Sequence, residues 1–383
     1  GFGWSFGPFE TWQAAGWSFI AEAINADIKN KKTISTEPLP AWVFENNRMG
    51  VHSAEGSYSP AQKTNQPRTS LSVYSRQLYK DPILGEKATY GKTVYENAGV
   101  RLWTLDDEVT ILSFKSKMQT EPPFSVGANL AQVVQAVSEN NFEVIDNMIK
   151  KFQQASMALK YSLVPTVAAL QGMALGGGCE FVMHCAKTVA ALESYMGLVE
   201  VGVGLLPAGG GCKEFVLRAA QEAKGGNIFP FLQKYFENVA MGRVSKSAQD
   251  AKELGYLKQS DTIVFNPYEL LYISINEVKN MYESAYRPPI KARDILITGK
   301  GGTATLKAGL VNMLEGHFIS PHDFEIGKRV ATIFGGGEIE QGCVVSEDWL
   351  LELEYRYFAE LVRMPKTQER IAYMLKNGKP LRN

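Results

Sequence analysis

The chain has 383 residues, of which 45% are hydrophobic and 21% are charged, and its formal net charge is zero. This is the composition of a globular protein with room for two or three hydrophobic cores. The balanced charge excludes a broad electrostatic attraction to nucleic acid or to an anionic membrane, and we predict neither partner. The sequence begins with glycine rather than methionine, so we expect it to be part of a longer protein.

Cysteine and histidine residues show no spacing that is typical of a metal site, and we expect no metal in this chain. The four cysteines, Cys179, Cys185, Cys212 and Cys343, are expected to be free thiols in a reducing compartment, which favours the cytoplasm. His184 lies in an apolar stretch and is interpreted as a hydrogen-bonded core residue rather than as a ligand.

The first hundred residues combine a helix with polar segments. Pro8 is well placed at the first turn of a helix that runs through Trp12 and Ala15. The segments 30–40 and 52–70 are predicted to be connectors, the second of them mobile. A hairpin is predicted over 101–117, with its turn at Asp106 and Asp107.

Strand and helix patterns alternate in the middle of the chain. Residues 141–160 have apolar side chains at helical spacing, and 164–172 form an apolar strand. A glycine loop, a helix through Phe181 and a strand over 187–192 follow, which predicts an α/β fold. Because the apolar run 164–186 contains Gln171, Glu180 and several glycines, we interpret it as strand, loop and helix rather than as a membrane span. Past Leu205 the chain is mainly helical, with predicted helices over 228–254, 268–285, 303–315, 322–333 and 347–376.

Two glycine-rich loops each carry a carboxylate in apolar surroundings. In ALGGGCE, residues 174–180, a strand ends in glycines that open a helix, where free N–H groups and the helix dipole attract negative charge. A tight turn would be the commoner interpretation of this loop alone. The second loop, GLVEVGVGLLPAGGG (197–211), places Glu200 in a similar setting. Glu180 and Glu200 therefore form a candidate pair for general acid/base chemistry beside a carbonyl site.

Longer segments around these loops resemble a known family. PTVAALQGMALGGGCEFVMHC, followed by YMGLVEVGVGLLPAGGGCKEFVLRAA, resembles the core signature of the crotonase (enoyl-CoA hydratase/isomerase) superfamily, with both glutamates at the family's positions. FSVGANL resembles the family's Gly-Ala-Asp loop, with Asn129 where Asp is usual. The resemblance covers most of 101–383. It implies an α/β fold with a crotonase-type ββα spiral core and C-terminal helices.

This resemblance also implies an activity. An enoyl-CoA hydratase adds water syn to a trans-2-enoyl-CoA in fatty acid β-oxidation and gives a 3-hydroxyacyl-CoA. The N–H groups of Ala128 and Gly177 would hold the thioester oxygen, Glu180 would activate water for attack at C3, and Glu200 would exchange the proton at C2. A double-bond isomerase and a non-catalytic assembly role are the alternatives.

Further substrate contacts follow from the same resemblance. Leu206 and Pro207 are expected to line the acyl pocket, with core packing as the alternative for the leucine. Lys379 would contact the CoA phosphates unless it is a solvated tail residue. Gly127 and Gly176 complete the expected substrate-binding set.

The opening stretch carries a second resemblance. GFGWSFGPFETW is similar to the C-terminal helical domain of L-3-hydroxyacyl-CoA dehydrogenases, with Gln13 where that motif often has Asp. This implies the C-terminal half of a bifunctional dehydrogenase/hydratase, with a helical remnant of the dehydrogenase at 1–40, a connector at 41–100, the crotonase-like core at 101–266 and completing helices at 267–383. No strand-borne GxGxxG is present, so NAD is expected only for the missing N-terminal domain, and this chain would need acyl-CoA alone. A homo-oligomer and a thiolase partner are expected.

One departure from the family pattern concerns the residues before the Gly-Ala loop. Only residues 118–123 join the strand of the hairpin to this loop, where crotonase-like chains usually have a helix and a second strand of about 30 residues. We expect these residues to be missing from the sequence. A genuine deletion would misplace the loop of Ala128.

Overall fold

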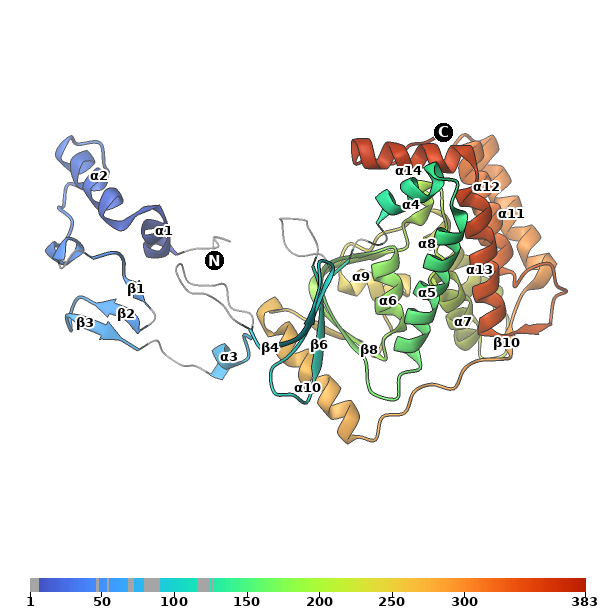
Figure 1. Cartoon of the computed structure of the whole chain (residues 1–383), viewed down its shortest axis with the longest axis horizontal. Helices are drawn as coiled ribbons and strands as arrows, with labels where there is room; N and C mark the ends of the chain where they lie inside the picture. The colour runs from blue at the N-terminus through green and yellow to red at the C-terminus, as the bar shows by residue number, and fades with distance from the viewer. Residues whose placement is uncertain are drawn as a thin grey trace. The chain divides into compact units, whose positions relative to one another are not determined.

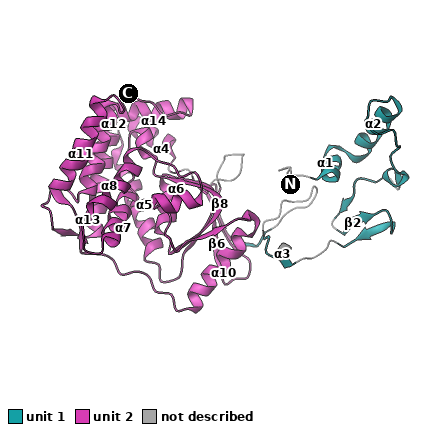
Figure 2. Ribbon diagram, turned by 180° about the vertical axis from the view of Figure 1, so that it is seen from behind, with its two compact units in different colours: residues 1–92 teal, residues 93–383 magenta. Residues whose placement is uncertain are grey.

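The computed structural model describes residues 7–45, 48–53, 55–67, 72–78, 90–115, 124–125, 127 and 129–383. The chain divides into two compact units, Gly1–Lys92 and Thr93–Asn383, which Figure 2 colours separately. Among the helices of the described residues, none has the length and apolar character needed to span a membrane.

The first unit begins with the predicted helix. α1 (Pro8–Ala15) starts at Pro8, and α2 (Trp17–Lys29) follows it directly. Trp17 is buried in a small core of its own unit, and its indole N–H donates to the carbonyl of Val43 at 2.9 Å. The unit also contains a 3-10 turn at Ala41–Val43 and the short helix α3 (Ser72–Ser75).

Part of the predicted mobile connector is instead an ordered sheet. Its three antiparallel strands are β1 (His52–Ser53), β2 (Gly56–Ser59) and β3 (Thr64–Gln66). The side chain of Gln13 in α1 holds the start of this sheet, because its Oε1 accepts from the N–H groups of Val51 and His52 at 3.1 and 3.0 Å. Its Nε2 donates to the carbonyl of His52 at 2.6 Å. The pattern of turn-forming residues did not reveal this long-range anchor.

The second unit begins with the sheet that contains the predicted hairpin. Its strands are β4 (Lys92–Glu96), β5 (Val100–Thr104) and β6 (Thr110–Phe114), in that order. The turn lies at Asp106 and Asp107, as predicted, and Asp107 has a φ of 61°. The Asp106 carboxylate accepts from the N–H groups of Glu108 and Val109, which closes the turn.

A parallel sheet lies at the centre of the second unit. Its strands are β7 (Val167–Leu175), β8 (Lys187–Gly197) and β9 (Thr262–Val264), in that order. The helix α6 (Gly177–His184) connects β7 to β8, and α5 (Phe142–Lys160) packs on α6. The predicted strand–helix–strand unit and the α/β class are thereby confirmed.

Helices form the rest of the second unit, and α11, α12 and α13 lie side by side in Figure 1. Two predicted helices are each broken in two. The segment 228–254 breaks before Ser247, whose side chain caps a new helix, and 347–376 breaks at Pro365, which begins the last helix. The remaining elements are α4 (Leu130–Ser138), α7 (Gly211–Ala223), α8 (Phe229–Ala240), α9 (Ala248–Leu254), α10 (Leu270–Glu283), α11 (Gly299–Glu315), α12 (Pro321–Phe334), α13 (Glu347–Val362), α14 (Pro365–Asn377), β10 (Ile295–Leu296) and β11 (Val344–Val345).

Candidate active site

The first predicted carboxylate lies in the first turn of α6, where it is almost fully buried. The side chain of Glu180 points at the start of α7, and its Oε1 accepts from the N–H groups of Gly209 and Gly211, both at 2.8 Å. Glycine is needed at position 209 because a Cβ atom there would lie 2.7 Å from Oε2 of Glu180. The two glycine loops of the sequence are therefore joined through this carboxylate.

Burial changes the ionisation of Glu180. Removal from water raises the pKa of the carboxyl to about 7, although the two N–H donors and Lys213 favour the charged form. A carboxyl that titrates near neutrality can take up or release a proton under ordinary conditions, which is what a general acid or base requires.

The second predicted carboxylate approaches the same place from another element. Glu200 begins the short 3-10 turn Glu200–Val203 that follows β8. Its Oε1 lies close to Gly176, where a Cβ atom would be 3.1 Å away, and Gly176 has a φ of +54°. Burial first, and then the charge of Glu180, raise the pKa of Glu200 well above its usual value. Chain reversal therefore brings Glu200 against Gly176, the residue before α6, and close enough to Glu180 for the charge of one acid to act on the other.

A carbonyl-binding position lies next to this pair. Gly177 is the first residue of α6, so its N–H has no acceptor within the helix, and the positive end of the helix dipole lies there. Ser125 pairs with the end of β7, since its N–H donates to Met173 and its carbonyl accepts from Leu175. This pairing brings Gly127 against Gly177, whose N atom would lie 3.4 Å from a Cβ on Gly127. The predicted loops of the oxyanion hole therefore meet, while Ala128 lies outside the described residues.

Comparison with a family model shows the family to which this part of the chain belongs. The enoyl-CoA hydratase/isomerase family matches residues 119–257, a range that contains both carboxylates and both glycine loops. Residues 119–257 are a crotonase-family domain.

Similar proteins carry related names. The chain is 36% identical to a Bacillus subtilis protein named "Probable 3-hydroxyacyl-CoA dehydrogenase", over all of this chain and 50% of that protein. It is 27% identical to a "Fatty acid oxidation complex subunit alpha" from Idiomarina loihiensis, over 66% of this chain and 33% of that protein. The chain also matches a crystal structure of an enoyl-CoA hydratase from Rhodobacter sphaeroides, with 16% identity and a TM-score of 0.44. The match covers 68% of this chain and 75% of the hydratase chain.

The chain spans about half the length of the curated relatives that it matches over almost its whole extent. The alignment with the Bacillus subtilis protein has 416 positions against 383 residues here, so that relative contains at least 33 residues without a counterpart. This number is close to the roughly 30 residues expected to be missing before the Gly-Ala loop. The joining residues 118–123 lie outside the described part of the chain.

A third buried carboxylate was missed by the sequence reasoning. Glu354 in α13 is fully buried, and its two oxygens accept from the N–H groups of Gly210 and Lys213 at 2.8 and 2.6 Å. Glu180 and Glu354 therefore accept from different backbone N–H groups at the start of α7. Burial and the charge of Glu180 raise the pKa of Glu354. The signal in the sequence was an acid on the apolar face of a predicted helix, one turn from Leu350.

A buried ionic network connects α7 with α5, α6 and α13. The amino group of Lys213 contacts His184 Nε2, Glu214 and Glu347 at 2.9, 3.2 and 3.1 Å, and Lys160 pairs with the same two glutamates. His184 also bonds to the carbonyl of Glu180 through Nδ1, so it is a hydrogen-bonded core residue, as interpreted. Burial, together with the positive charge of Lys213, lowers the pKa of His184 to about 3. No group of three or more metal-ligating side chains occurs among the described residues.

The remaining predicted contacts lie in different surroundings. Leu206 is fully buried in the main core, and Pro207 is buried beside it. Lys379 is exposed, just after the end of α14. An aromatic side chain that was not predicted lies nearest the site: the ring of Phe152 would lie 2.9 Å from a Cβ on Gly177 and 2.0 Å from one on Gly209. Phe152 and Oε2 of Glu180 therefore both lie against Gly209.

Proposed function

We propose that the crotonase domain of this chain is an enoyl-CoA hydratase that adds water to a trans-2-enoyl-CoA. The observation that carries this proposal is the proximity of two buried carboxylates, Glu180 in the first turn of α6 and Glu200 against Gly176, to the N–H of Gly177, which has no acceptor within the helix. A donor at a helix start stabilises the oxyanion that forms on a thioester carbonyl, and one such donor is typically worth about 3–4 kcal/mol of activation barrier.

The different surroundings of the two acids support different roles. Glu180 accepts two backbone N–H groups, which favour its charged form. Oε2 of Glu200 is buried without a hydrogen-bond partner among the described residues, which favours its protonated form. A pair of carboxyls whose pKa values are separated by their environments is typical of an acid and a base that act together.

In the proposed reaction, water attacks C3 of the enoyl chain and gives a proton to Glu180. Glu200 gives its proton to C2 from the same face, so that the sum of the two steps is syn addition of one water molecule. The negative charge that develops on the thioester oxygen is held by the N–H of Gly177 and, in the same proposal, by that of Ala128. Proton exchange with solvent then restores the starting state of the two carboxyls.

The test is the loss of the enone absorbance of crotonyl-CoA in water. We expect Glu180→Gln and Glu200→Gln each to lower kcat by a factor on the order of 100 or more, because proton transfer by a positioned group contributes about 10²–10⁴-fold. Glutamine at 180 retains an oxygen that accepts both glycine N–H groups, so folding is preserved in this control. Unchanged hydration rates in both variants would contradict the proposal.

Two alternatives lead to different results in related assays. An isomerase needs only one acid to move a proton, so Glu180→Gln would spare the conversion of a 3-enoyl-CoA to the 2-enoyl isomer. A non-catalytic assembly part would show no binding of a long-chain acyl-CoA in calorimetry. The presence of a second acid, Glu180, beside Glu200 favours hydration over isomerisation.

For the whole protein, we propose a role in fatty acid β-oxidation together with a 3-hydroxyacyl-CoA dehydrogenase. The names of the relatives and the dehydrogenase-like opening segment support this, and NAD would bind outside the present chain. A homo-oligomer, a thiolase partner and a cytoplasmic location belong to the same proposal.

A further inference from the structure

The loop that carries Glu200 is held by its backbone rather than by its carboxylate. Oε2 of Glu200 has no hydrogen-bond partner among the described residues, whereas the carbonyl of Glu200 accepts from the N–H of Leu205 at 3.0 Å. The position of the carboxylate is therefore set by the conformation of residues 200–205. Whatever fixes this loop also fixes the distance of the carboxylate from Gly176.

One fixed point of the loop is Thr367 in α14. Its hydroxyl donates to the carbonyl of Gly204 at 2.9 Å and lies 2.9 Å from Nε2 of His322. Thr367 and His322 are both buried. Gly204 has a φ of +87°, and a Cβ there would lie 2.9 Å from Cα of Thr367, so α14 packs directly on the loop.

A second fixed point is Arg370, one turn further along α14. This arginine is fully buried, and its guanidinium donates to the carbonyl of Val201 at 3.3 Å and to Oδ1 of Asp323 at 2.7 Å. The same group donates to Ser320 Oγ at 3.0 Å and to Asn383 Oδ1 at 2.8 Å. The planar guanidinium thus joins the Glu200 loop to the start of α12 and to the C-terminal residue.

We propose that Arg370 and Thr367 are positioning residues for Glu200, which hold the loop 200–204 so that its carboxylate stays at Gly176. This rests on the proposed function, since it concerns the placement of one of its two acids. Burying an arginine without acceptors is costly, and here its acceptors lie in three chain segments: the Glu200 loop, the start of α12 and Asn383. A point charge such as lysine cannot reproduce this forked geometry.

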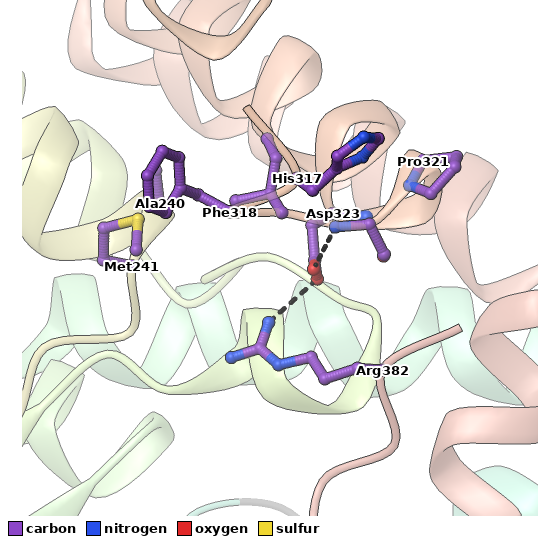
Figure 3. Close-up of a pocket in the computed structure, with 9 residues that line it drawn as sticks. Ala240, Met241, His317, Phe318, Pro321, Asp323 and Arg382 are labelled. Atoms are coloured by element: carbon purple, nitrogen blue, oxygen red, sulfur yellow. Dashed lines mark hydrogen bonds and ion pairs between the residues drawn. The ribbon is translucent and has the colours of Figure 1, made fainter. Parts of the chain in front are cut away.

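The chain offers a matched control for this proposal. Arg382 donates to the same oxygen of Asp323, at 3.0 Å, but its side chain is 62% exposed (Figure 3). No hydrogen bond or ion pair between Arg382 and residues 200–204 is found in the described part of the chain. Comparison of Arg370→Lys with Arg382→Lys therefore separates support of the Glu200 loop from the ion pair at Asp323.

The experiment measures hydration of crotonyl-CoA and amide hydrogen exchange on the same proteins. For Arg370→Lys we expect kcat to fall by a factor on the order of ten or more, with KM changed less than about twofold, because a small displacement of a catalytic group lowers the rate without weakening binding. The amide of Leu205 should exchange faster in Arg370→Lys than in wild type. Thr367→Val should show the same pattern to a smaller degree, and Arg382→Lys should show neither change.

If the wild type hydrates crotonyl-CoA, equal kcat values for Arg370→Lys and Arg382→Lys would overturn the proposal. Unchanged exchange at Leu205 in both Arg370→Lys and Thr367→Val would also overturn it. If the wild type has no hydratase activity, the proposed function fails, whereas the exchange measurement still decides whether α14 holds the loop.

Discussion

Glu180 and Glu200 lie close together with different kinds of support. The carboxylate of Glu180 is held directly, by two backbone N–H groups at the start of α7. That of Glu200 has an oxygen without a partner among the described residues, and its loop is held through the backbone by α14. One acid is fixed by its own hydrogen bonds and the other by the packing of its chain segment.

This difference shows how a fold can separate two chemically identical groups. Both carboxyls are buried, which raises both pKa values, but Glu180 accepts from two N–H groups at the start of α7, whereas the hydrogen bond to Glu200 comes from its own backbone. Directly bonded Glu180 is suited to carry the negative charge and to accept a proton, whereas Glu200 is suited to hold one.

The largest expected effect is on the pH dependence of stability. Folding raises the pKa of Glu180 from 4.5 to about 7, so the folded state keeps a proton that the unfolded state releases. Its contribution to stability is therefore fully present below pH 4.5 and is lost as the pH rises through about 7. The loss is on the order of 3 kcal/mol, and it should be absent in Glu180→Gln. Urea unfolding at a series of pH values measures it.

The comparison of wild type with Glu180→Gln reports the titration of Glu180 together with its effect on Glu200 and Glu354, whose pKa values its charge raises. His184, whose pKa is lowered to about 3, acts in the opposite sense in both, since its contribution is lost as the pH falls below 6.5. Parallel stability curves for the two proteins between pH 4.5 and 7 would contradict a raised pKa at Glu180.

The sequence predicted much of this site because its signals are local. Glycines that end a strand and open a helix place Glu180 and Gly177 together within one turn, and a similar glycine-rich loop marks Glu200. Elements with a strong period, such as α5, were also predicted within a few residues. These features depend on neighbours along the chain, which a sequence displays directly.

The supports of the two acids could not be predicted in the same way. Glu354 bonds to Gly210 across 144 residues, and Arg370 bonds to Val201 across 169 residues. Such contacts depend on how α13 and α14 pack, and no short motif encodes that packing. In α13 the hint was Glu354 on a face with Leu350 and Phe358, whereas Arg370 in α14 stands one turn from Lys366 and Thr367 and gave no such hint.

A second prediction concerns the space beside Glu180. A Cβ on Gly209 would lie 2.0 Å from the ring of Phe152 and 2.7 Å from Oε2 of Glu180, so Gly209→Ala must displace one of them. We expect a loss of about 1–3 kcal/mol in the free energy of unfolding, which is typical of overpacking in a core. Chemical denaturation measures this loss, and the hydration rate should fall with it because the carboxylate moves.

The matched control for this change is Gly309→Ala. Gly309 lies within α11, and no atom is found within 4 Å of a Cβ placed on it. Alanine favours a helix interior over glycine, so this variant should be more stable by about 0.5–1 kcal/mol. A Gly209→Ala protein as stable as the wild type would show that the glycine loop has room that the structure does not indicate.

The smallest expected effect comes from the shielding of Glu180 by Phe152, which packs against Phe181 with ring centroids 4.8 Å apart. Phe152→Leu keeps an apolar side chain but leaves part of the ring's volume open to water. Since burial is the largest cause of the raised pKa, the acid limb of the pH–rate profile of hydration should move below about 7. Phe324→Leu, a change of the same size at a half-buried position in α12, should leave the limb in place. A limb that does not move in Phe152→Leu would mean that the loops themselves, rather than this ring, keep water from Glu180.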